Sequence, residues 1–131
     1  MFPDILNEVR EIMVTEVVTI SPDRVIAEAA KLMEDKDVGS VIVVENKKVV
    51  GIITERDFLR LAAAGYDVRT MKVRDGMTKP PIVCEPSMKI TDAYALMRNR
   101  RVRHVPVVEK NGELVGIVGF RDLITHGRLI L

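Results

Sequence analysis

Two short segments carry residue types that could recognise a small molecule. In Gly51–Asp57 and Gly116–Asp122 an apolar run reaches Thr54 or Gly119, and an Arg-Asp pair closes the segment. Each pattern predicts a strand that ends where a helix begins, with a carboxylate beside the helix N-terminus. Free backbone N–H groups at such a place can bind a phosphate, and a carboxylate can accept hydrogen bonds from both hydroxyls of a ribose.

A purely structural interpretation of the same residues is also open. Thr54 could cap its helix, and Asp57 could simply interact favourably with the helix dipole. In the ligand-binding interpretation, Arg56 and Arg121 add charge-assisted contacts to phosphate oxygens. The Arg-Asp pair occurs in both segments although the surrounding sequence drifts, which favours ligand binding. Because Asp57 falls at a predicted helix start, we expect its replacement to change folding little.

The two segments belong to a repeat that covers most of the chain. When the sequence is shifted by 64 residues, 13 of the 37 positions in residues 9–45 are identical to residues 73–109. One inserted residue near Asn111 changes the shift to 65, and the two glycine-to-aspartate segments then align. A repeat of this length predicts one supersecondary unit used twice. Two copies are too few for an open solenoid, so we expect a closed pair.

The elements that must position these segments follow one order in both copies. Ser21 as a cap and Pro22 at the first helical position predict a helix start in the first copy. The elements expected there are a strand, a helix, two strands and a helix, over Val17–Ile20, Ser21–Lys36, Ser40–Glu45, Val49–Thr54 and Glu55–Ala64. The counterparts in the second copy are Ile82–Cys84, Pro86–Arg100, His104–Glu109, Leu114–Val118 and a helix from Arg121 onward.

The expected architecture is α+β, with two pseudo-symmetric strand-helix-strand-strand-helix motifs packed sheet to sheet. One motif of this size buries too little surface to be stable alone. We divide the chain into a first motif over residues 1–66, a connection over 67–72 and a second motif over 73–131. A helical segment, Asp4–Met13, is expected to lead into the first motif.

Composition narrows the function classes. The chain of 131 residues is 47% hydrophobic and 30% charged with a formal net charge of +1, as in an ordinary globular protein. No apolar run approaches the roughly 20 residues that span a bilayer, so we expect a cytoplasmic protein without a membrane segment. Aromatic residues make up 4%, which disfavours stacking on nucleic-acid bases. Neither a nucleophile–base pair nor a metal-ligand spacing is evident, so we expect no enzyme, no metal and no catalytic cofactor.

The repeat resembles the cystathionine-beta-synthase (CBS) domain, two of which in tandem form a Bateman module. The resemblance rests on the Gly-h-h-Thr-x-x-Asp signature of Gly51–Asp57, where h is apolar, and on its partner. It also rests on the leading Val-Arg-x-x-Met segments, the Ser-Pro or Glu-Pro after the first strand, and Val102–Val107. It extends from about Val9 to Thr125.

The resemblance implies a regulatory module that binds AMP, ADP, ATP, S-adenosylmethionine or a related adenosine compound in clefts between the motifs. One cleft, expected to be the main one, would take Ile52, Thr54, Arg56, Asp57, Ile82, Val102, Arg103 and His104. The other would take Val18, Ser21, Val38, Gly39, Arg121 and Asp122. The family also implies a homodimer and a separate regulated protein, which the sequence does not identify.

The two copies differ in ways that rank the expected clefts. Gly119 replaces the hydroxyl of Thr54, and uncharged Gly39 stands where the second copy has Arg103. The cleft with Asp57 is therefore predicted to bind a phosphorylated ligand better. Two alternatives remain open: an interaction adaptor whose clefts hold no ligand, and a nucleic-acid-binding protein. The second would use a basic cluster, Arg98–Arg103, which otherwise serves as a solvated helix end.

Overall fold

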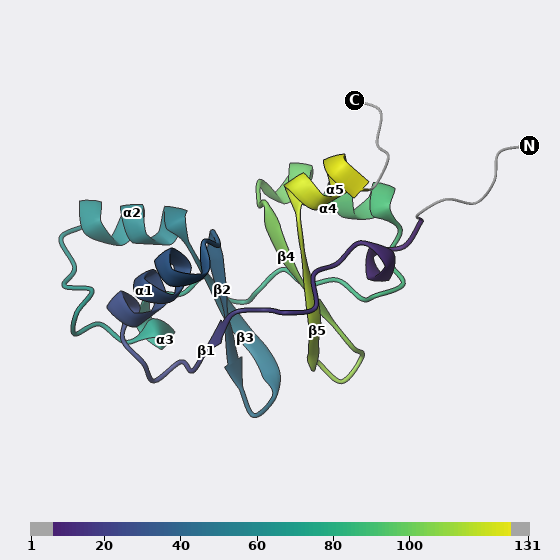
Figure 1. Cartoon of the computed structure of the whole chain (residues 1–131). Coiled ribbons are helices and arrows are strands. Elements are labelled where there is room, and N and C mark those ends of the chain that lie inside the picture. Colours follow the sequence, from purple (N-terminus) through teal and green to yellow (C-terminus); the bar gives the residue numbers. More distant parts are fainter. Residues whose placement is uncertain (1–6, 127–131) are drawn as a thin grey trace, which may run out of the picture. The chain divides into compact units, whose positions relative to one another are not determined.

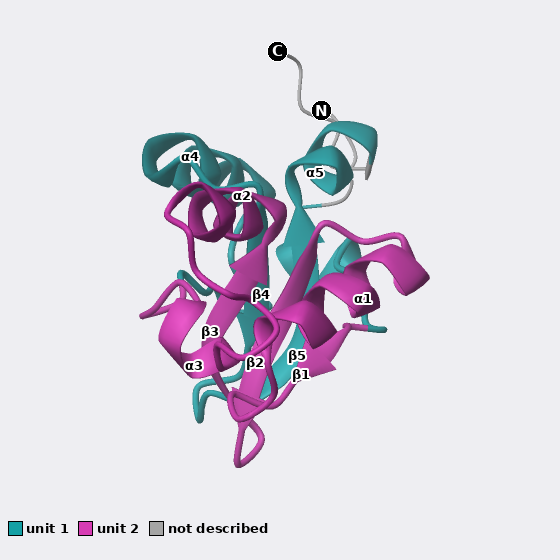
Figure 2. Cartoon of the chain, turned by 90° about the vertical axis from the view of Figure 1, so that its left-hand side faces the viewer, with its two compact units in different colours: residues 1–16, 82–131 teal, residues 17–81 magenta. Residues whose placement is uncertain are grey.

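The computed structural model describes residues 7–126, with His126 described by its backbone only. By its internal contacts the chain divides into two compact units, one of residues 1–16 with 82–131 and one of residues 17–81 (Figure 2). We call these unit 1 and unit 2. Each unit has its own apolar core, and each mixes helices with strands. The expected α+β class with two motifs is confirmed.

Unit 2 contains a three-stranded mixed sheet with helices packed on it (Figure 1). Strand β2 lies between β1, to which it is parallel, and β3, to which it is antiparallel. Fully buried Ile26, Val41, Ile53 and Leu61 bring the helices and the sheet into one core. The elements in order are β1 (Thr19–Ile20), α1 (Ile26–Lys36), β2 (Ser40–Glu45), β3 (Lys48–Thr54), α2 (Glu55–Ala63) and α3 (Val73–Gly76).

Unit 1 repeats this plan with a smaller sheet. Strands β4 and β5 form an antiparallel pair, and Cys84 adds a single parallel bridge to Val107. Buried Ile90, Val105 and Leu123 join its helices to this pair. The elements in order are a 3-10 turn η1 (Val9–Glu11), α4 (Ile90–Arg100), β4 (His104–Val108), β5 (Leu114–Gly119) and α5 (Phe120–His126).

The strand expected over Ile82–Cys84 is reduced to that single bridge, and proline explains the loss. In unit 2, Ile42 N donates to Val18 O at 3.0 Å, which extends the pairing of β1. The counterpart of Ile42 is Pro106, which has no N–H to donate to Ile82. Cys84 N donates to Pro106 O and Cys84 O accepts from Val108 N, but this pairing does not extend back to Ile82.

The helix starts expected at Ser21-Pro22 and at Pro86 are wrong. Helices α1 and α4 begin four residues later, at Ile26 and Ile90. Pro22 O instead accepts from Arg74 N at 3.0 Å, and Ser21 Oγ accepts from Asp23 N at 3.3 Å in a local turn. A tertiary backbone contact therefore uses the carbonyl that the helix would have used.

The leading segments of the two motifs are exchanged between the units. Residues 7–14, which the sequence assigns to the first motif, pack in unit 1, and the leading segment of the second motif packs in unit 2. Val9 N donates to Met88 O at 2.8 Å, and Val73 N donates to Arg24 O at 2.7 Å. Both valines are fully buried in the core that they join. The division at residues 66 and 73 therefore follows the repeat but does not follow the contacts.

Each leading segment packs its methionine against a glycine of the neighbouring strand, where a larger residue would not fit. A Cβ on Gly51 would overlap the Met77 side chain, and one on Gly116 would lie 2.7 Å from Met13 Sδ. The leaders then pair with the strands: Thr78 bridges Ile52 of β3 in unit 2. The expected leading helix over Asp4–Met13 is only the turn η1 in its described part, and Asp4–Leu6 lie outside the described residues.

Candidate functional site: the two strand-to-helix corners

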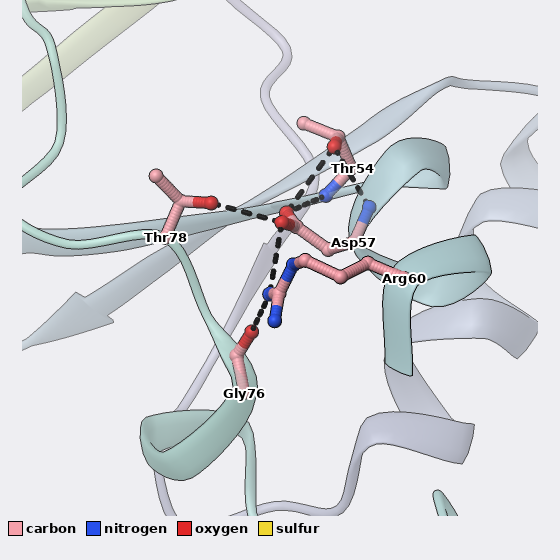
Figure 3. A network of polar contacts seen from close by, with 5 residues as sticks. All are labelled: Thr54, Asp57, Arg60, Gly76 and Thr78. Atoms are coloured by element: carbon pink, nitrogen blue, oxygen red, sulfur yellow. Dashed lines mark hydrogen bonds and ion pairs between the residues drawn. The ribbon is translucent and has the colours of Figure 1, made fainter. Parts of the chain in front are cut away.

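The corner between β3 and α2 is closed by reciprocal hydrogen bonds. Thr54 N donates to Asp57 Oδ2 at 2.8 Å, and Asp57 N donates to Thr54 Oγ1 at 3.4 Å. The two side chains thus satisfy backbone groups at the helix start in a capping box (Figure 3). Thr54 Oγ1 also lies 3.2 Å from Asp57 Oδ2, and Glu55 N donates to Gly39 O at 3.3 Å. The structural role that the sequence left open is therefore present.

The other carboxylate oxygen of Asp57 faces two donors from elsewhere in unit 2. Thr78 Oγ1 donates to Asp57 Oδ1 at 2.9 Å, and Arg60 Nη2 approaches the same oxygen at 3.3 Å. Arg60 Nη2 also donates to Gly76 O at 3.1 Å, so it connects α2 to the leading segment of the second motif (Figure 3). Asp57 is only 5% exposed. A buried carboxylate needs such partners to offset its lost hydration.

This network changes one expectation about Asp57. A side chain that lies at a solvated helix start could be replaced at little cost, as the sequence suggested. Asp57 instead is buried and joins three segments: the end of β3, α2 and residues 76–78. Its removal would leave donors without an acceptor, so it must contribute to stability as well as to any binding.

The corner between β5 and α5 has the same backbone and fewer polar side chains. Gly119 N donates to Asp122 Oδ2 at 2.8 Å, as Thr54 N does to Asp57. Phe120 N donates to Arg103 O at 2.8 Å, which matches the bond between Glu55 and Gly39. This bond from Gly119 closes the start of α5 as the bond from Thr54 closes the start of α2. The residues aligned with Thr78 and Arg60 are Val14 and Thr125.

The remaining predicted site residues divide between the two units. Unit 2 holds the first-copy residues, with Ile52 buried in β3 and Val38 38% exposed after α1. Unit 1 holds Ile82, Val102, Arg103 and His104 together with Arg121 and Asp122. Unit 2 holds Val18, Ser21, Val38 and Gly39 together with Ile52, Thr54, Arg56 and Asp57. The assignment of residues from both units to one cleft remains a prediction.

Three arginines that were expected to meet phosphate are accessible. Arg56, Arg103 and Arg121 are all exposed, the first and last of them in the opening turns of α2 and α5. The guanidinium of Arg98, from the basic cluster, lies 5.9 Å from the centre of the Tyr94 ring. This cation–π contact gives Arg98 a structural role on α4.

Sequence reasoning missed the donors to Asp57 Oδ1. Arg60 lies one turn after Asp57 on α2, so the spacing for an ion pair was visible. Thr78 follows the repeated methionine and stands where the first copy has Val14. Nothing local indicated that residues 76–78 would return to the corner of the first copy, because that contact depends on the exchange of leading segments.

A second set of charges fastens the leading segment in unit 2. Arg74 Nη2 contacts Asp23 Oδ1 at 2.6 Å and Glu45 Oε2 at 3.3 Å. The hydrogen bond and charge of Arg74 lower the pKa of Asp23, and the hydrogen bonds that Arg74 donates to the carboxylates of Asp23 and Glu45 raise the pKa of Arg74. The groups are exposed, so they orient the segment more than they stabilise it.

A groove along α1 in unit 2 is a weaker candidate site. It has a volume of about 680 Å³. Two basic and two acidic side chains line it, so it offers no net attraction to phosphate. Its lining residues are Thr19, Ile20, Ser21, Arg24, Glu28, Lys31, Leu32, Asp35 and Val44.

A metal site, a membrane-spanning helix or a reactive thiol would each indicate another kind of function. No group of His, Cys, Asp and Glu side chains in residues 7–126 could hold a metal ion, and no helix there is long and apolar enough to cross a membrane. Cys84 is buried, and burial raises the pKa of its thiol to about 11. A thiol with that pKa is a poor nucleophile at neutral pH.

Comparison with known proteins identifies the repeated unit. The family model for the CBS domain matches residues 9–64 and again residues 68–128. An uncharacterized 17.7 kDa protein of Acidianus ambivalens is 41% identical over 118 residues, which are 89% of this chain and 71% of that protein. The CBS domain-containing protein YhcV of Bacillus subtilis is 40% identical over 122 residues, covering 92% of this chain and 86% of that protein.

A solved structure shares the fold along most of both chains. The CBS domain protein PAE2072 from Pyrobaculum aerophilum, complexed with AMP, superimposes with a TM-score of 0.84 at 30% sequence identity. The match covers 90% of this chain and 91% of that one. The aligned repeat, the matched corners and these likenesses lead to one conclusion: the chain belongs to the CBS-domain family and is a tandem CBS pair.

Proposed function

We propose that this protein is a non-catalytic regulatory module that binds an adenosine nucleotide, with AMP as the first candidate. The observation that carries the proposal is the corner at Asp57. A buried carboxylate stands there beside a threonine hydroxyl and a helix N-terminus, in a fold similar to that of a protein complexed with AMP. The carboxylate suits a ribose diol, and the hydroxyl and helix N-terminus suit a phosphate.

The residues around this ligand are proposed from the sequence resemblance. Asp57 accepts the ribose hydroxyls, and Thr54 and Arg56 contact the phosphate side of the ligand. Arg103 adds a positive charge, for which its exposed side chain is suited. The base would be lined by the apolar residues Ile52, Ile82 and Val102, with His104 beside them.

A second, weaker site is proposed at Asp122. It would use Arg121 and Asp122 together with Val18, Ser21, Val38 and Gly39. Gly119 supplies no hydroxyl there, and Gly39 supplies no charge. The number of favourable contacts with a phosphorylated ligand is therefore smaller, which supports the same ranking of the two sites as the sequence.

The output of the module is proposed to be a change in shape or association that a separate protein detects. We also propose that the chain forms a homodimer through its helices. Leu59 on α2 is 73% exposed and Ala63 one turn later is exposed as well, so α2 presents apolar surface to solvent. Light scattering of the purified chain tests the dimer, and Leu59→Glu should then give a monomer.

Calorimetric titration with AMP, ADP, ATP, S-adenosylmethionine and adenosine tests the ligand. The wild type should bind at least one of them, and Asp57→Asn should weaken that binding at least tenfold, because the amide is uncharged and offers one acceptor oxygen in place of two. Glu34→Gln, an exposed change from acid to amide on α1 of the same unit, is the matched control and should bind as the wild type does. Thermal melting checks that each variant is folded.

Asp122→Asn ranks the sites in the same titration. It should reduce the total binding less than Asp57→Asn does. A larger loss at Asp122 would reverse the ranking. If none of the five compounds binds at millimolar concentration, the proposed function is wrong and the adaptor alternative gains.

A further inference from the structure

The acceptor sites of Asp57 are fully used in this structure. An ionised carboxylate offers about four lone-pair positions for hydrogen bonds. Donors from three residues occupy them: Thr54 N and Thr54 Oγ1 at Oδ2, and Arg60 Nη2 and Thr78 Oγ1 at Oδ1 (Figure 3). A ribose diol, which brings two further donors, cannot bind this carboxylate unless some of the present donors leave.

The four donors differ in how easily they can leave. Thr54 N is a backbone group held at the end of β3, and its 2.8 Å bond closes the capping box. Thr78 Oγ1 belongs to an exposed side chain that one bond rotation turns away into water. Arg60 is 55% exposed at its side chain, and its 3.3 Å contact is longer than a strong charge-assisted bond. Oδ1 is therefore the oxygen that can be vacated.

We propose that Thr78 and Arg60 are displaceable donors that compete with the ligand for Asp57, and that Thr78 is the main competitor. The proposal rests on the proposed function, in which Asp57 binds a ribose diol. The two hydroxyls of the ligand take the places of the Thr78 hydroxyl and of Arg60 Nη2 at Oδ1, while Arg60 keeps its bond to Gly76 O. Thr78 therefore lowers the affinity for the ligand. It also adds selectivity, because only a ligand with a diol forms new hydrogen bonds to Asp57 in place of the one that Thr78 gives up.

The Asp122 corner shows that neither donor is needed to form such a corner. Asp122 Oδ2 accepts from Gly119 N at 2.8 Å, the same length as the bond from Thr54 N to Asp57. The aligned residues there are Val14, which has no hydroxyl, and Thr125, which has no positive charge. The capping bond is the same without them, so the bonds from Thr78 and Arg60 are additional to the cap and can be lost without opening it.

The position of Thr78 connects this competition to the rest of the chain. Its backbone is anchored to Ile52 of β3 by two hydrogen bonds, Ile52 N to Thr78 O at 3.2 Å and Thr78 N to Ile52 O at 2.9 Å. Residues 79–81 follow, and at residue 82 the chain enters unit 1. The side chain that the ligand displaces thus lies at the exit from unit 2, where a change can be passed along the chain.

The test is a titration of Thr78→Val, which removes the hydroxyl and keeps the shape, against Thr78→Ser, which keeps the hydroxyl. With AMP, Thr78→Val should bind about three- to tenfold tighter than the wild type, the factor expected from one net hydrogen bond. Thr78→Ser should stay near the wild type. With 2′,3′-dideoxyadenosine monophosphate, which lacks the diol, the wild type and Thr78→Val should bind alike.

The outcomes separate this inference from the proposed function. If the wild type binds AMP and Thr78→Val binds it equally or more weakly, the competition is wrong while the function stands. An equal gain for AMP and the dideoxy ligand would also overturn it. If no protein binds AMP or another adenosine compound, the function fails and the inference fails with it.

A second measurement on the wild type needs no substitution. The methyl resonance of Thr78, followed by NMR during addition of AMP, should shift as the side chain leaves Asp57. The methyl resonance of Thr70, which lies in unit 2 away from this network, is the control and should stay in place. An unmoved Thr78 resonance at saturating AMP would contradict the displacement.

Discussion

At the end of β3, Thr54, Arg60 and Thr78 supply four donors to Asp57, whereas at the end of β5 the residues aligned with them are Gly119, Thr125 and Val14. The backbone path is the same, and both carboxylates close their helix with a 2.8 Å bond. The comparison shows that this capping bond is common to both corners. The donors from Thr78 and Arg60 are found at Asp57 in addition to it.

The two leading segments, by contrast, make the same backbone contacts in their units although some of their side chains differ. Val9 with Met88 and Val73 with Arg24 make equivalent backbone bonds at 2.8 and 2.7 Å. Both leaders place a methionine against a strand glycine. The contact between leader and strand is thus the same within each unit, and in unit 2 it also brings the polar side chain of Thr78 to Asp57.

Removal of the carboxylates should give the largest difference between the corners. Asp57→Ala leaves Arg60, Thr78 and the cap without their acceptor and should lower the free energy of unfolding by about 2–4 kcal/mol. Asp122→Ala loses one capping bond and should cost about 1 kcal/mol. Urea denaturation at pH 7 measures both. Equal losses would mean that the additional bonds at Asp57 add no stability.

The next largest effect is expected on AMP affinity when the charge of Arg103 is removed. The aligned residue in the first copy, Gly39, carries no charge. Arg103→Ala should weaken AMP binding by about 1.5–3 kcal/mol, the usual range for a hydrogen bond to a charged group. Adenosine, which has no phosphate, should bind almost unchanged. Arg100→Ala at the end of α4 is the matched control. An equal loss for adenosine and AMP would show that Arg103 shapes the site rather than contacting phosphate.

A substitution that makes the second corner resemble the first should have a smaller effect. Gly119→Thr supplies the missing hydroxyl, and its Cβ would lie 3.3 Å from Asp122 Oδ2, a close contact that the carboxylate must relieve by a small shift. The new cap should raise the free energy of unfolding by about 1 kcal/mol. Gly119→Ala is the control for the loss of glycine flexibility alone. If both variants gain equally, the hydroxyl contributes nothing.

The smallest expected difference between the units is in how their stability depends on pH, because in unit 2 an ion pair holds the leading segment. Asp23 pairs with Arg74 in unit 2, while the aligned residue in unit 1 is Ser87. The pKa of Asp23 is lowered in the folded chain, so its stabilising contribution is present above the ordinary pKa and disappears as the pH falls through the lowered one. Asp23→Asn should therefore remove a small part of the acid sensitivity below pH 4. Identical urea midpoints for both proteins from pH 6 to pH 3 would contradict this.

The hairpins were predictable because their signals are local. The strand expected over Ser40–Glu45 is β2 at the same residues, and those expected over Val49–Thr54 and Leu114–Val118 differ from β3 and β5 by one residue. Turn residues between two apolar runs are enough for such pairs. The strand at Ile82–Cys84 failed because Pro106, on a different strand, could not donate to it.

The sequence predicted both strand-to-helix corners as sites from Asp57 and Asp122. It predicted only some of the side chains that contact Asp57. Thr54 and Asp57 are three residues apart on one turn, so their contact follows from local geometry. Thr78 is 21 residues from Asp57, and its hydrogen bond forms only because residues 73–78 pack in unit 2. No local pattern reports a contact of that kind.

The sequence by itself determined the repeat, the family and the carboxylate at each strand-to-helix corner, because these depend on residue types at fixed short spacings. Tertiary structure alone decided which leading segment packs in which unit. Both leaders carry Val-Arg-x-x-Met, so their sequences fit either unit, and the choice depends on how the chain closes over long separations. That choice brings Thr78 to Asp57 and Val14 to the other unit, and so makes two copies of one motif chemically different.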